Sequence, residues 1–377
     1  MTSSLLCLLS LTRNSNTHDD LSRSSAVDLH GDHYHVYDRF LPFCCVTMAT
    51  PKPDRIINYP IPGDEDGGRL FLFGRSTSQQ IIFFCAGFPD DHSAFSPLAA
   101  RLAKELDAFC GVTCLAGYDD CVEKPWASFR PQGYGFEEWV QALRTAAKTF
   151  RQASNCNDKV VFSTIFHDWG SVAGSLYTNR AIEEKDSLLV PDKIVYFDIL
   201  PSRSHKNEPN RPQPQTHSLG HMVKENAYRI TFALAFLLYH QLGKYMGMLV
   251  AKLGMLLLGV IATATDMRMD RFRELNPSRL VYMMFPYQNM VMDIAKSMVY
   301  KRPSIFKGFH LPLLQEVPVL FLYGASKSLQ MHDQNVADFL FQHEGKSNSI
   351  GVQNAGHWLY LHQPDECFEA IRKFLDS

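Results

Sequence analysis

An aspartate stands at the junction between an apolar run and a helix-like segment. The run VVFSTI (160–165) leads into FHDWGS (166–171), and SVAGSLYTNRAIEE (171–184) follows. A strand, a tight turn and a helix with small residues just after the turn form a nucleophile elbow, whose corner residue projects from the sheet. The free N–H groups at the start of the helix face that residue. The sequence therefore predicts that Asp168 is displayed at this corner.

The chemistry open to Asp168 differs from that of a serine. Ser171 falls inside the expected helix, and no G-x-S-x-G motif occurs elsewhere. A carboxyl group with an ordinary pKa of about 3.9 is already ionised at neutral pH and needs no base before it attacks. It can attack an electrophilic carbon and form an ester. A simple helix-capping role for Asp168 is the alternative.

Two further stretches supply what hydrolysis of such an ester requires. NAGHWLYLHQPD (354–365) places His357 on a loop after the last expected strand. A neutral imidazole there would activate water. CAGFPDD (85–91) places Phe88 directly after another expected strand. We predict that the backbone N–H groups of Phe88 and Trp169 stabilise the oxyanion formed during hydrolysis.

The acid that orients His357 has two candidates. Asp198 ends the apolar run KIVYFDIL (193–200), and Asp333 follows YGASKSLQMH. Either carboxylate could hold the imidazole in the tautomer that a catalytic triad needs. The residues alone leave this choice open.

Short apolar runs alternate with amphipathic segments along most of the chain. This alternation predicts an α/β fold with a mostly parallel sheet covered by helices on both faces. Reactive residues in such folds collect at the carboxyl ends of the strands. We expect strands at 69–74, 81–87, 111–117, 160–166, 193–200, 317–324 and from 349, and helices at 97–106, 136–150, 171–184 and 364–375.

The alternation stops between residues 201 and 310. A Pro- and Asn-rich linker opens this part, and apolar, Met-rich helical segments follow, which predicts a helical cap inserted into the core. Residues 245–265 are apolar except for Lys252. They predict a buried cap helix, with a membrane-contacting surface as the alternative. We therefore divide the chain into an N-terminal extension (1–47), a first core part (48–200), the cap (201–310) and a second core part (311–377).

Composition excludes some partners. The 377 residues carry a net charge of −2, so no general attraction to nucleic acid is expected. The nine cysteines are scattered and lack zinc-site spacing, which predicts reduced, buried thiols and favours the cytoplasm. The extension is polar and contains His30, His33 and His35, which we interpret as a solvated tail rather than a metal site.

These motifs resemble the α/β-hydrolase superfamily, in particular its aspartate-nucleophile branch of epoxide hydrolases and haloalkane dehalogenases. The resemblance covers roughly residues 55–377, with GFPD (87–90), HDWGS (167–171), a cap and GHW (356–358) in the order typical of the branch. It implies Asp168 as nucleophile, His357 as general base, and Phe88 and Trp169 as oxyanion donors. It also implies a small lipophilic substrate, water as the second reactant and no cofactor.

The chain departs from that pattern at three places. Ala86 precedes Gly87 where the family usually has His-Gly, and Phe166 replaces a small residue two positions before the nucleophile. After the expected strand at 317–324 the family often has an acid in a G-x-x-D pattern, but here Lys327 takes that position. This favours Asp198 over Asp333 as the acid.

The branch divides between two reactions. Dehalogenases resembling this chain bind the leaving halide with the Trp after the nucleophile and with a second donor, either an Asn after the first His-Gly or a Trp from the cap. In this chain Phe88 stands at the Asn position, and all four tryptophans lie outside the cap. Epoxide hydrolases use cap tyrosines, of which Tyr282 and Tyr287 are our candidates. We therefore expect an epoxide hydrolase, with a dehalogenase or a non-catalytic protein that binds an apolar ligand or a membrane as alternatives. The substrate and the oligomeric state do not follow from the sequence.

Overall fold

The computed structural model describes most of the chain after residue 49. The N-terminal extension with its histidines, and Trp126, lie outside the described residues. The described ranges are 50–119, 130–155, 160–201, 205–207, 219–261, 275–327, 332–343 and 346–377, with single residues 212 and 330.

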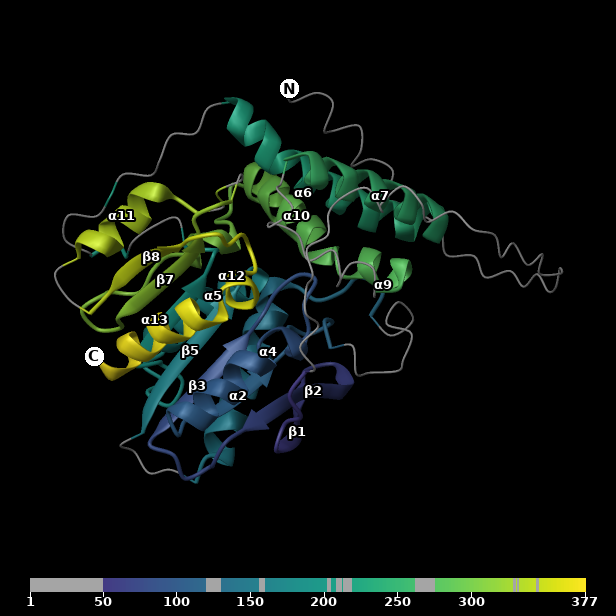
Figure 1. Ribbon diagram of the computed structural model, residues 1–377. Coiled ribbons are helices and arrows are strands. Elements are labelled where there is room, and N and C mark those ends of the chain that lie inside the picture. Colours follow the sequence, from purple (N-terminus) through teal and green to yellow (C-terminus); the bar gives the residue numbers. More distant parts are fainter. Residues whose placement is uncertain are drawn as a thin grey trace. The chain divides into compact units, whose positions relative to one another are not determined.

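An eight-stranded sheet forms the centre of the described chain (Figure 1). Its spatial order is β1-β2-β4-β3-β5-β6-β7-β8, and the pairs from β4 onward are parallel, whereas β1–β2 and β2–β4 are antiparallel. The mostly parallel sheet predicted from the sequence is confirmed. The strands are β1 (Arg55–Ile61), β2 (Asp64–Phe73), β3 (Gln80–Cys85), β4 (Phe109–Thr113), β5 (Val161–His167), β6 (Lys193–Phe197), β7 (Val319–Gly324) and β8 (Asn348–Val352).

Strand β1 is the strand that the sequence analysis did not predict. It carries Asn58 and Pro60 and buries only Tyr59 and Ile61 among its seven residues. Such a strand is tolerated at the edge of a sheet, where a proline costs no ladder hydrogen bond. Its sequence therefore lacks the continuous apolar run that marked the central strands.

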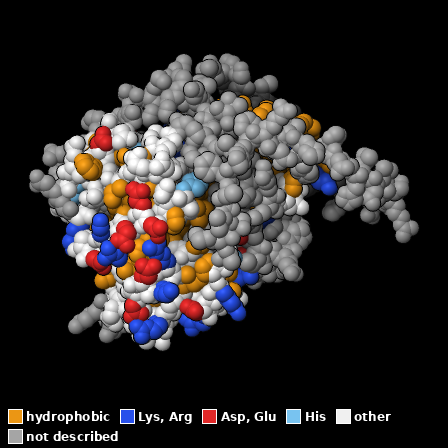
Figure 2. Space-filling view, viewed as in Figure 1, with side chains coloured by type: hydrophobic (Ala, Val, Ile, Leu, Met, Phe, Trp, Pro, Cys, Tyr) orange, Lys and Arg blue, Asp and Glu red, His pale blue; other side chains and the backbone are white. Residues whose placement is uncertain are grey.

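Helices cover both faces of the sheet, as predicted. Phe83 of β3 belongs to the apolar core on the side of α4 and α5, and Phe84 belongs to the core on the side of α2 and α13. Over α2 and α13, acidic and basic side chains are interspersed on the surface (Figure 2). The helices are α2 (Ser96–Glu105), α4 (Phe136–Ala153), α5 (Trp169–Glu183), α11 (Gln334–Gln342) and α13 (Pro364–Asp376), with two short helices, η1 (His92–Ala94) and α12 (Leu359–His362).

Helices make up most of the described chain between β6 and β7. Phe285 packs against Trp139 and Tyr118 of the core, and the Tyr118 hydroxyl donates a hydrogen bond of 2.8 Å to the carbonyl oxygen of Met283. These contacts hold the helical segment against the carboxyl-terminal ends of the strands. Its elements are α6 (Leu219–Leu242), α7 (Lys244–Ile261), α9 (Pro277–Tyr282), α10 (Phe285–Tyr300) and the 3₁₀ turn η3 (Ile305–Gly308).

Helix α7 differs from the expected buried helix, because only one of its sides is buried. Ala251 is 3% exposed, whereas Leu249 and Leu253 are 61% and 51% exposed. Within the described part of the chain, every helix is too short or too polar to cross a bilayer. Residues 262–265 of the apolar segment lie outside the described residues.

Four cysteines lie in the described core, and all are free thiols. Cys85, Cys110, Cys114 and Cys367 are buried, as the sequence predicted for the first three. Burial in apolar surroundings raises the pKa of the Cys85 and Cys110 thiols well above the ordinary value. These cysteines are therefore packing residues and poor nucleophiles.

Candidate active site

Asp168 occupies the corner between β5 and α5. Its backbone has φ 54° and ψ −127°, and α5 begins at the next residue, Trp169. A non-glycine residue in this conformation is strained, and strain of this kind persists where the surrounding structure enforces it. Gly170 is required here, because a Cβ at that position would overlap the carbonyl oxygen of Cys85. The predicted elbow is therefore present.

Two backbone N–H groups bind the Asp168 carboxylate. The N–H of Phe88 donates to Oδ1 at 2.7 Å, and the N–H of Trp169 also contributes a hydrogen bond to the carboxylate. Gly87 makes this approach possible, because a Cβ there would overlap Trp169 N and Asp168 Oδ1. Oδ1 therefore lies where the sequence analysis placed the oxyanion.

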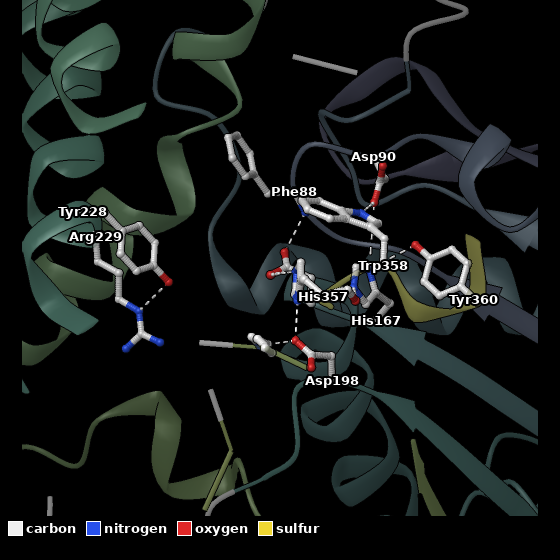
Figure 3. A network of polar contacts seen from close by, with 11 residues as sticks. Phe88, Asp90, His167, Asp198, Tyr228, Arg229, His357, Trp358 and Tyr360 are labelled. Carbon is white, nitrogen blue, oxygen red and sulfur yellow. Dashed lines mark hydrogen bonds and ion pairs between the residues drawn. The ribbon is translucent and has the colours of Figure 1, made fainter. Parts of the chain in front are cut away.

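His357 lies against the second oxygen of Asp168 (Figure 3). Its Nε2 is 3.4 Å from Asp168 Oδ2, and its Nδ1 forms a short hydrogen bond with Asp198 Oδ2. All three side chains are largely or fully buried. The structure thus brings together Asp168, His357 and Asp198 from the ends of β5, β8 and β6, in the geometry of a catalytic triad.

Asp333 has a different position. It is the N-cap of α11, where its Oδ1 accepts a hydrogen bond of 3.0 Å from the backbone N–H of Asn335. Of the two acids that the sequence left open, Asp198 is the one that contacts His357. Asp198 directly follows β6, so it lies at the edge of the sheet where the ends of the parallel strands meet, whereas Asp333 lies farther along its loop at the start of α11.

A buried lysine completes the polar cluster. The Lys327 side chain is 1% exposed, and its Nζ forms an ion pair with Asp198 Oδ2, the same oxygen that contacts His357. Asp198 Oδ1 has no hydrogen-bond partner among the described residues. The sequence showed a lysine where an acid was expected but did not predict this contact.

Charge interactions within this cluster shift the pKa of each group. Burial disfavours the imidazolium form of His357, but Asp198 and Asp168 raise its pKa to about 9, and Lys327 acts in the opposite direction. Burial also disfavours charge on the two acids, yet Lys327 and His357 lower the pKa of Asp198, and His357 lowers that of Asp168. The unreacted site therefore holds two carboxylates and an imidazolium at neutral pH.

A second set of hydrogen bonds holds the His357 loop in place (Figure 3). His167 Nε2 lies 3.1 Å from the carbonyl oxygen of His357, and His167 Nδ1 lies 3.2 Å from the hydroxyl of Tyr360. The Trp358 indole donates to Asp90 at 2.6 Å. Burial lowers the pKa of His167 to about 3, so it is neutral and serves as a tether. The sequence analysis did not identify this network.

The two candidate tyrosines lie in different surroundings. The Tyr287 ring packs edge-on against Trp169 and Phe88, with centroid separations of 5.2 and 5.7 Å. Burial, followed by the charge of Asp168, raises the pKa of Tyr287 well above its ordinary value. Tyr282 instead packs against Phe236 and Phe285. The structure places Tyr287, and not Tyr282, next to Phe88 and Trp169.

Tyr228 of α6 also lies beside Tyr287, although the sequence analysis did not select it. Its ring lies 6.3 Å from that of Tyr287, and its hydroxyl accepts a hydrogen bond of 3.3 Å from Arg229 Nε. Phe232, one turn further along α6, contacts both Phe88 and Tyr287. Because residues four apart share one helix face, this spacing could have identified Tyr228 once α6 was known to face the site.

Of the described tryptophans other than Trp169, none places its indole N–H beside Asp168 as a second halide donor. Trp139 Nε1 donates to the carbonyl oxygen of Ala116 at 3.0 Å, and Trp358 donates to Asp90. This leaves Trp169 as the described tryptophan whose ring lies beside Tyr287, to which its side chain hydrogen-bonds. Among described residues, no group of three or more His, Cys, Asp or Glu side chains is arranged to hold a metal ion.

Comparison with known proteins supports the fold. No family model and no curated protein matches the sequence. An epoxide hydrolase from metagenomes of hot environments aligns with a TM-score of 0.53 and 14% identity, over 85% of this chain and 98% of its own. A haloalkane dehalogenase loop variant from Bradyrhizobium elkanii aligns with a TM-score of 0.55 and 14% identity, over 85% of this chain and 96% of its own. An epoxide hydrolase from Bacillus megaterium aligns with a TM-score of 0.51 and 16% identity, over 86% of this chain and 100% of its own. The chain therefore has the α/β-hydrolase fold.

Proposed function

We propose that this protein is a cofactor-independent hydrolase that opens lipophilic epoxides through an ester on Asp168. One observation carries this proposal. The two oxygens of the Asp168 carboxylate have separate partners, because the backbone N–H of Phe88 binds Oδ1 and His357 lies beside Oδ2. A helix cap would need neither a buried histidine nor the acid Asp198 behind it.

The first half-reaction uses Asp168 as the nucleophile. Its Oδ2 attacks a ring carbon of the epoxide, a C–O bond forms, and the bond from that carbon to the ring oxygen breaks. A hydroxyl of Tyr287 or Tyr228 hydrogen-bonds the departing oxygen, which gains one proton. Loss of the Asp168 charge removes one of the two carboxylates that raise the pKa of His357. His357 can then release its proton, which replaces the proton that the tyrosine gives to the alkoxide oxygen.

The second half-reaction uses the neutral His357. Nε2 accepts a proton from water, and the hydroxide attacks Cγ of the ester. The negative charge appears on Oδ1, which already accepts the hydrogen bond from Phe88. When the intermediate collapses, the bond from Cγ to the alkyl oxygen breaks and that oxygen takes the proton from His357. The Asp168 carboxyl group left by this collapse returns its proton to His357. The products are therefore a diol and the original site, with the Asp168 carboxylate and the His357 imidazolium restored.

The rings around Asp168 favour an epoxide over a haloalkane. A leaving halide needs two donors, and Trp169 is the one described tryptophan available beside the elbow. A departing epoxide oxygen needs hydroxyl donors, and the Tyr287 and Tyr228 rings lie beside each other, with that of Tyr287 against Phe88. A haloalkane dehalogenase is the second candidate. The contact between Asp198 and His357 argues against a non-catalytic role.

Intact-protein mass spectrometry of a His357→Gln variant tests the proposed function. Without its base, the protein should form the ester and fail to hydrolyse it. Incubation with lipophilic epoxides is expected to add the whole mass of one epoxide molecule, and the adduct should be absent when Asp168 is also changed to Asn. An alkyl adduct lacking halogen, formed from haloalkanes alone, would establish the dehalogenase. No adduct with either panel would contradict the proposal.

A further inference from the structure

Helix α7 packs on α6 through its small residues. Gly247, Ala251 and Gly254 form one side of α7, and a Cβ at Gly247 would overlap Tyr239 of α6. A Cβ at Gly254 would be 2.7 Å from the Phe232 ring. These small residues let the two helices approach closely, so the large apolar side chains of α7 lie on its other side.

That other side is exposed. At 100° per residue, five large side chains fall within about 100° of the helix circumference. Soluble monomers rarely expose so many large apolar side chains together, and such a surface usually marks an interaction site. We call this set the α7 face: Tyr245, Met246, Leu249, Leu253 and Leu256, with exposures of 75%, 39%, 61%, 51% and 59%.

We propose that the α7 face binds the surface of a membrane that contains anionic lipids. The charged residues of α7 are Lys244 and Lys252, both exposed, and the helix contains no Asp or Glu. Lysines beside an apolar helix face attract anionic headgroups while the apolar side chains enter the interface. Hydrophobic side chains are visible at the upper right edge of Figure 2, where Figure 1 shows α7.

The α7 face lies near the candidate active site, and this position is consistent with an apolar substrate. Helix α6 separates α7 from the site, and its Phe232 contacts both Gly254 of α7 and Phe88 beside Asp168. A lipid surface bound at α7 would therefore lie one helix away from the aromatic side chains above Asp168.

Vesicle co-sedimentation with the full chain tests this proposal without reference to catalysis. Vesicles of phosphatidylcholine with roughly a third phosphatidylserine should bind the protein at least about tenfold more strongly than they bind a Leu249→Glu/Leu253→Glu variant. Phe341→Glu on α11 is the matched control, because Phe341 is 68% exposed and lies on another element. It should bind like the unmodified protein.

Two results would overturn the membrane proposal. One is equal sedimentation of the unmodified protein and a double variant whose circular dichroism is native. The other is absence of vesicle binding together with a dimer, detected by light scattering, that the double substitution dissociates. That second result would show that the α7 face joins two copies of the chain.

A second inference concerns Lys327, and it rests on independent contacts. Two cationic groups, Lys327 Nζ and His357 Nδ1, contact the same oxygen of Asp198. Removing a lysine side chain from water is costly unless a charge partner offsets the loss. The ion pair with Asp198 offsets this cost for Lys327, whose side chain is 1% exposed.

We propose that Lys327 is a positioning residue that, through Asp198, makes His357 release its proton more readily. With Lys327 present, Asp198 forms an ion pair with Nζ of that lysine and stabilises an imidazolium less strongly. A histidine that must act as a base in the ester form benefits from this. The catalytic part of this inference rests on the proposed function, but the effect on protonation does not.

Other ionisable groups near His357 come from several elements. Asp168 at the end of β5 favours the imidazolium, and His167 of β5 has its ring centroid 4.4 Å from that of His357. His332, which precedes α11, interacts electrostatically with Asp198 and Lys327. Asp90 Oδ2 lies 3.9 Å from His167 Nδ1. These groups remain in place when Lys327 alone is changed.

Direct titration of His357 by NMR, in the substrate-free protein with labelled histidine, tests the inference. Lys327→Met should raise the pKa of His357 by about one unit or more, because the opposing cation is lost. Lys193→Met is the matched control, since Lys193 is also buried but donates to the carbonyl oxygens of Phe374 and Leu375, away from the triad. Lys193→Met should leave the His357 pKa unchanged. Lys327→Arg should give a His357 pKa close to that of the unmodified protein.

The same shift should appear in the pH dependence of ester hydrolysis. The base must be neutral, so the rate rises with pH through the pKa of His357, and Lys327→Met should move this limb to higher pH. An unchanged His357 titration in folded Lys327→Met, or in Lys327→Gln if the first variant does not fold, would overturn the inference. Because the titration needs no substrate, it remains decisive if the proposed reaction is wrong.

Discussion

Asp168→Asn is expected to reduce epoxide hydrolysis by about 10⁴-fold or more, the scale seen when a covalent nucleophile is removed. The amide cannot form the ester, and it also lacks the charge that balances His357. Steady-state hydrolysis of a lipophilic epoxide measures the loss. Intact mass must first show that the asparagine is unchanged, since deamidation would restore the carboxylate.

Asp333→Asn is the matched control for that substitution. Asp333 caps α11 and was the alternative acid in the sequence analysis. Its change should cost about 1 kcal/mol of stability or less and leave the hydrolysis rate near that of the unmodified protein. If Asp168→Asn retained activity while Asp333→Asn lost it, the assignment of the nucleophile would be wrong.

Tyr287→Phe and Tyr228→Phe are expected to slow ester formation from an epoxide by about 10²-fold or more each, in the range for loss of a general acid. The charge of Asp168 contributes to the high pKa of Tyr287, and esterification removes that charge. Tyr287 therefore becomes a stronger acid as the epoxide oxygen needs its proton. The measurement is the rate of adduct formation in the His357→Gln background, which excludes hydrolysis.

Tyr282→Phe provides the control for the tyrosine pair. Tyr282 is equally buried but packs against Phe236 and Phe285, so its change should leave adduct formation nearly unaltered. Haloalkanes give a second comparison, because a departing halide does not need a proton. Equal slowing with epoxides and haloalkanes would mean that the hydroxyls act through packing and not through proton donation.

Local patterns predicted the fold and the position of Asp168 at the corner of the elbow. Continuous apolar strands followed by amphipathic helices predicted the parallel sheet, because a strand buried on both faces needs apolar residues throughout. The elbow could be predicted because its requirements lie within a few residues: a strand end, Asp168, and small residues at 170 and 171. Strand β1 was missed because an edge strand with Pro60 need not follow those rules.

Contacts between distant segments were decided by the tertiary structure. Asp198 and His357 are 159 residues apart, and their hydrogen bond depends on the order of β5, β6, β7 and β8 in the sheet. The sequence could therefore name Asp198 and Asp333 as candidates but could not determine from local pattern which acid meets the histidine. The contact of Lys327 with Asp198 has the same origin.

The cap shows this division most clearly. Its sequence contains several tyrosines and a long apolar segment, and composition indicates neither which ring faces the site nor which helix face is buried. Packing of α6 against α7 places Tyr228 and Phe232 toward the site and the α7 face toward the outside. Helical periodicity specifies which residues share a face, but the neighbouring helix determines which face is buried.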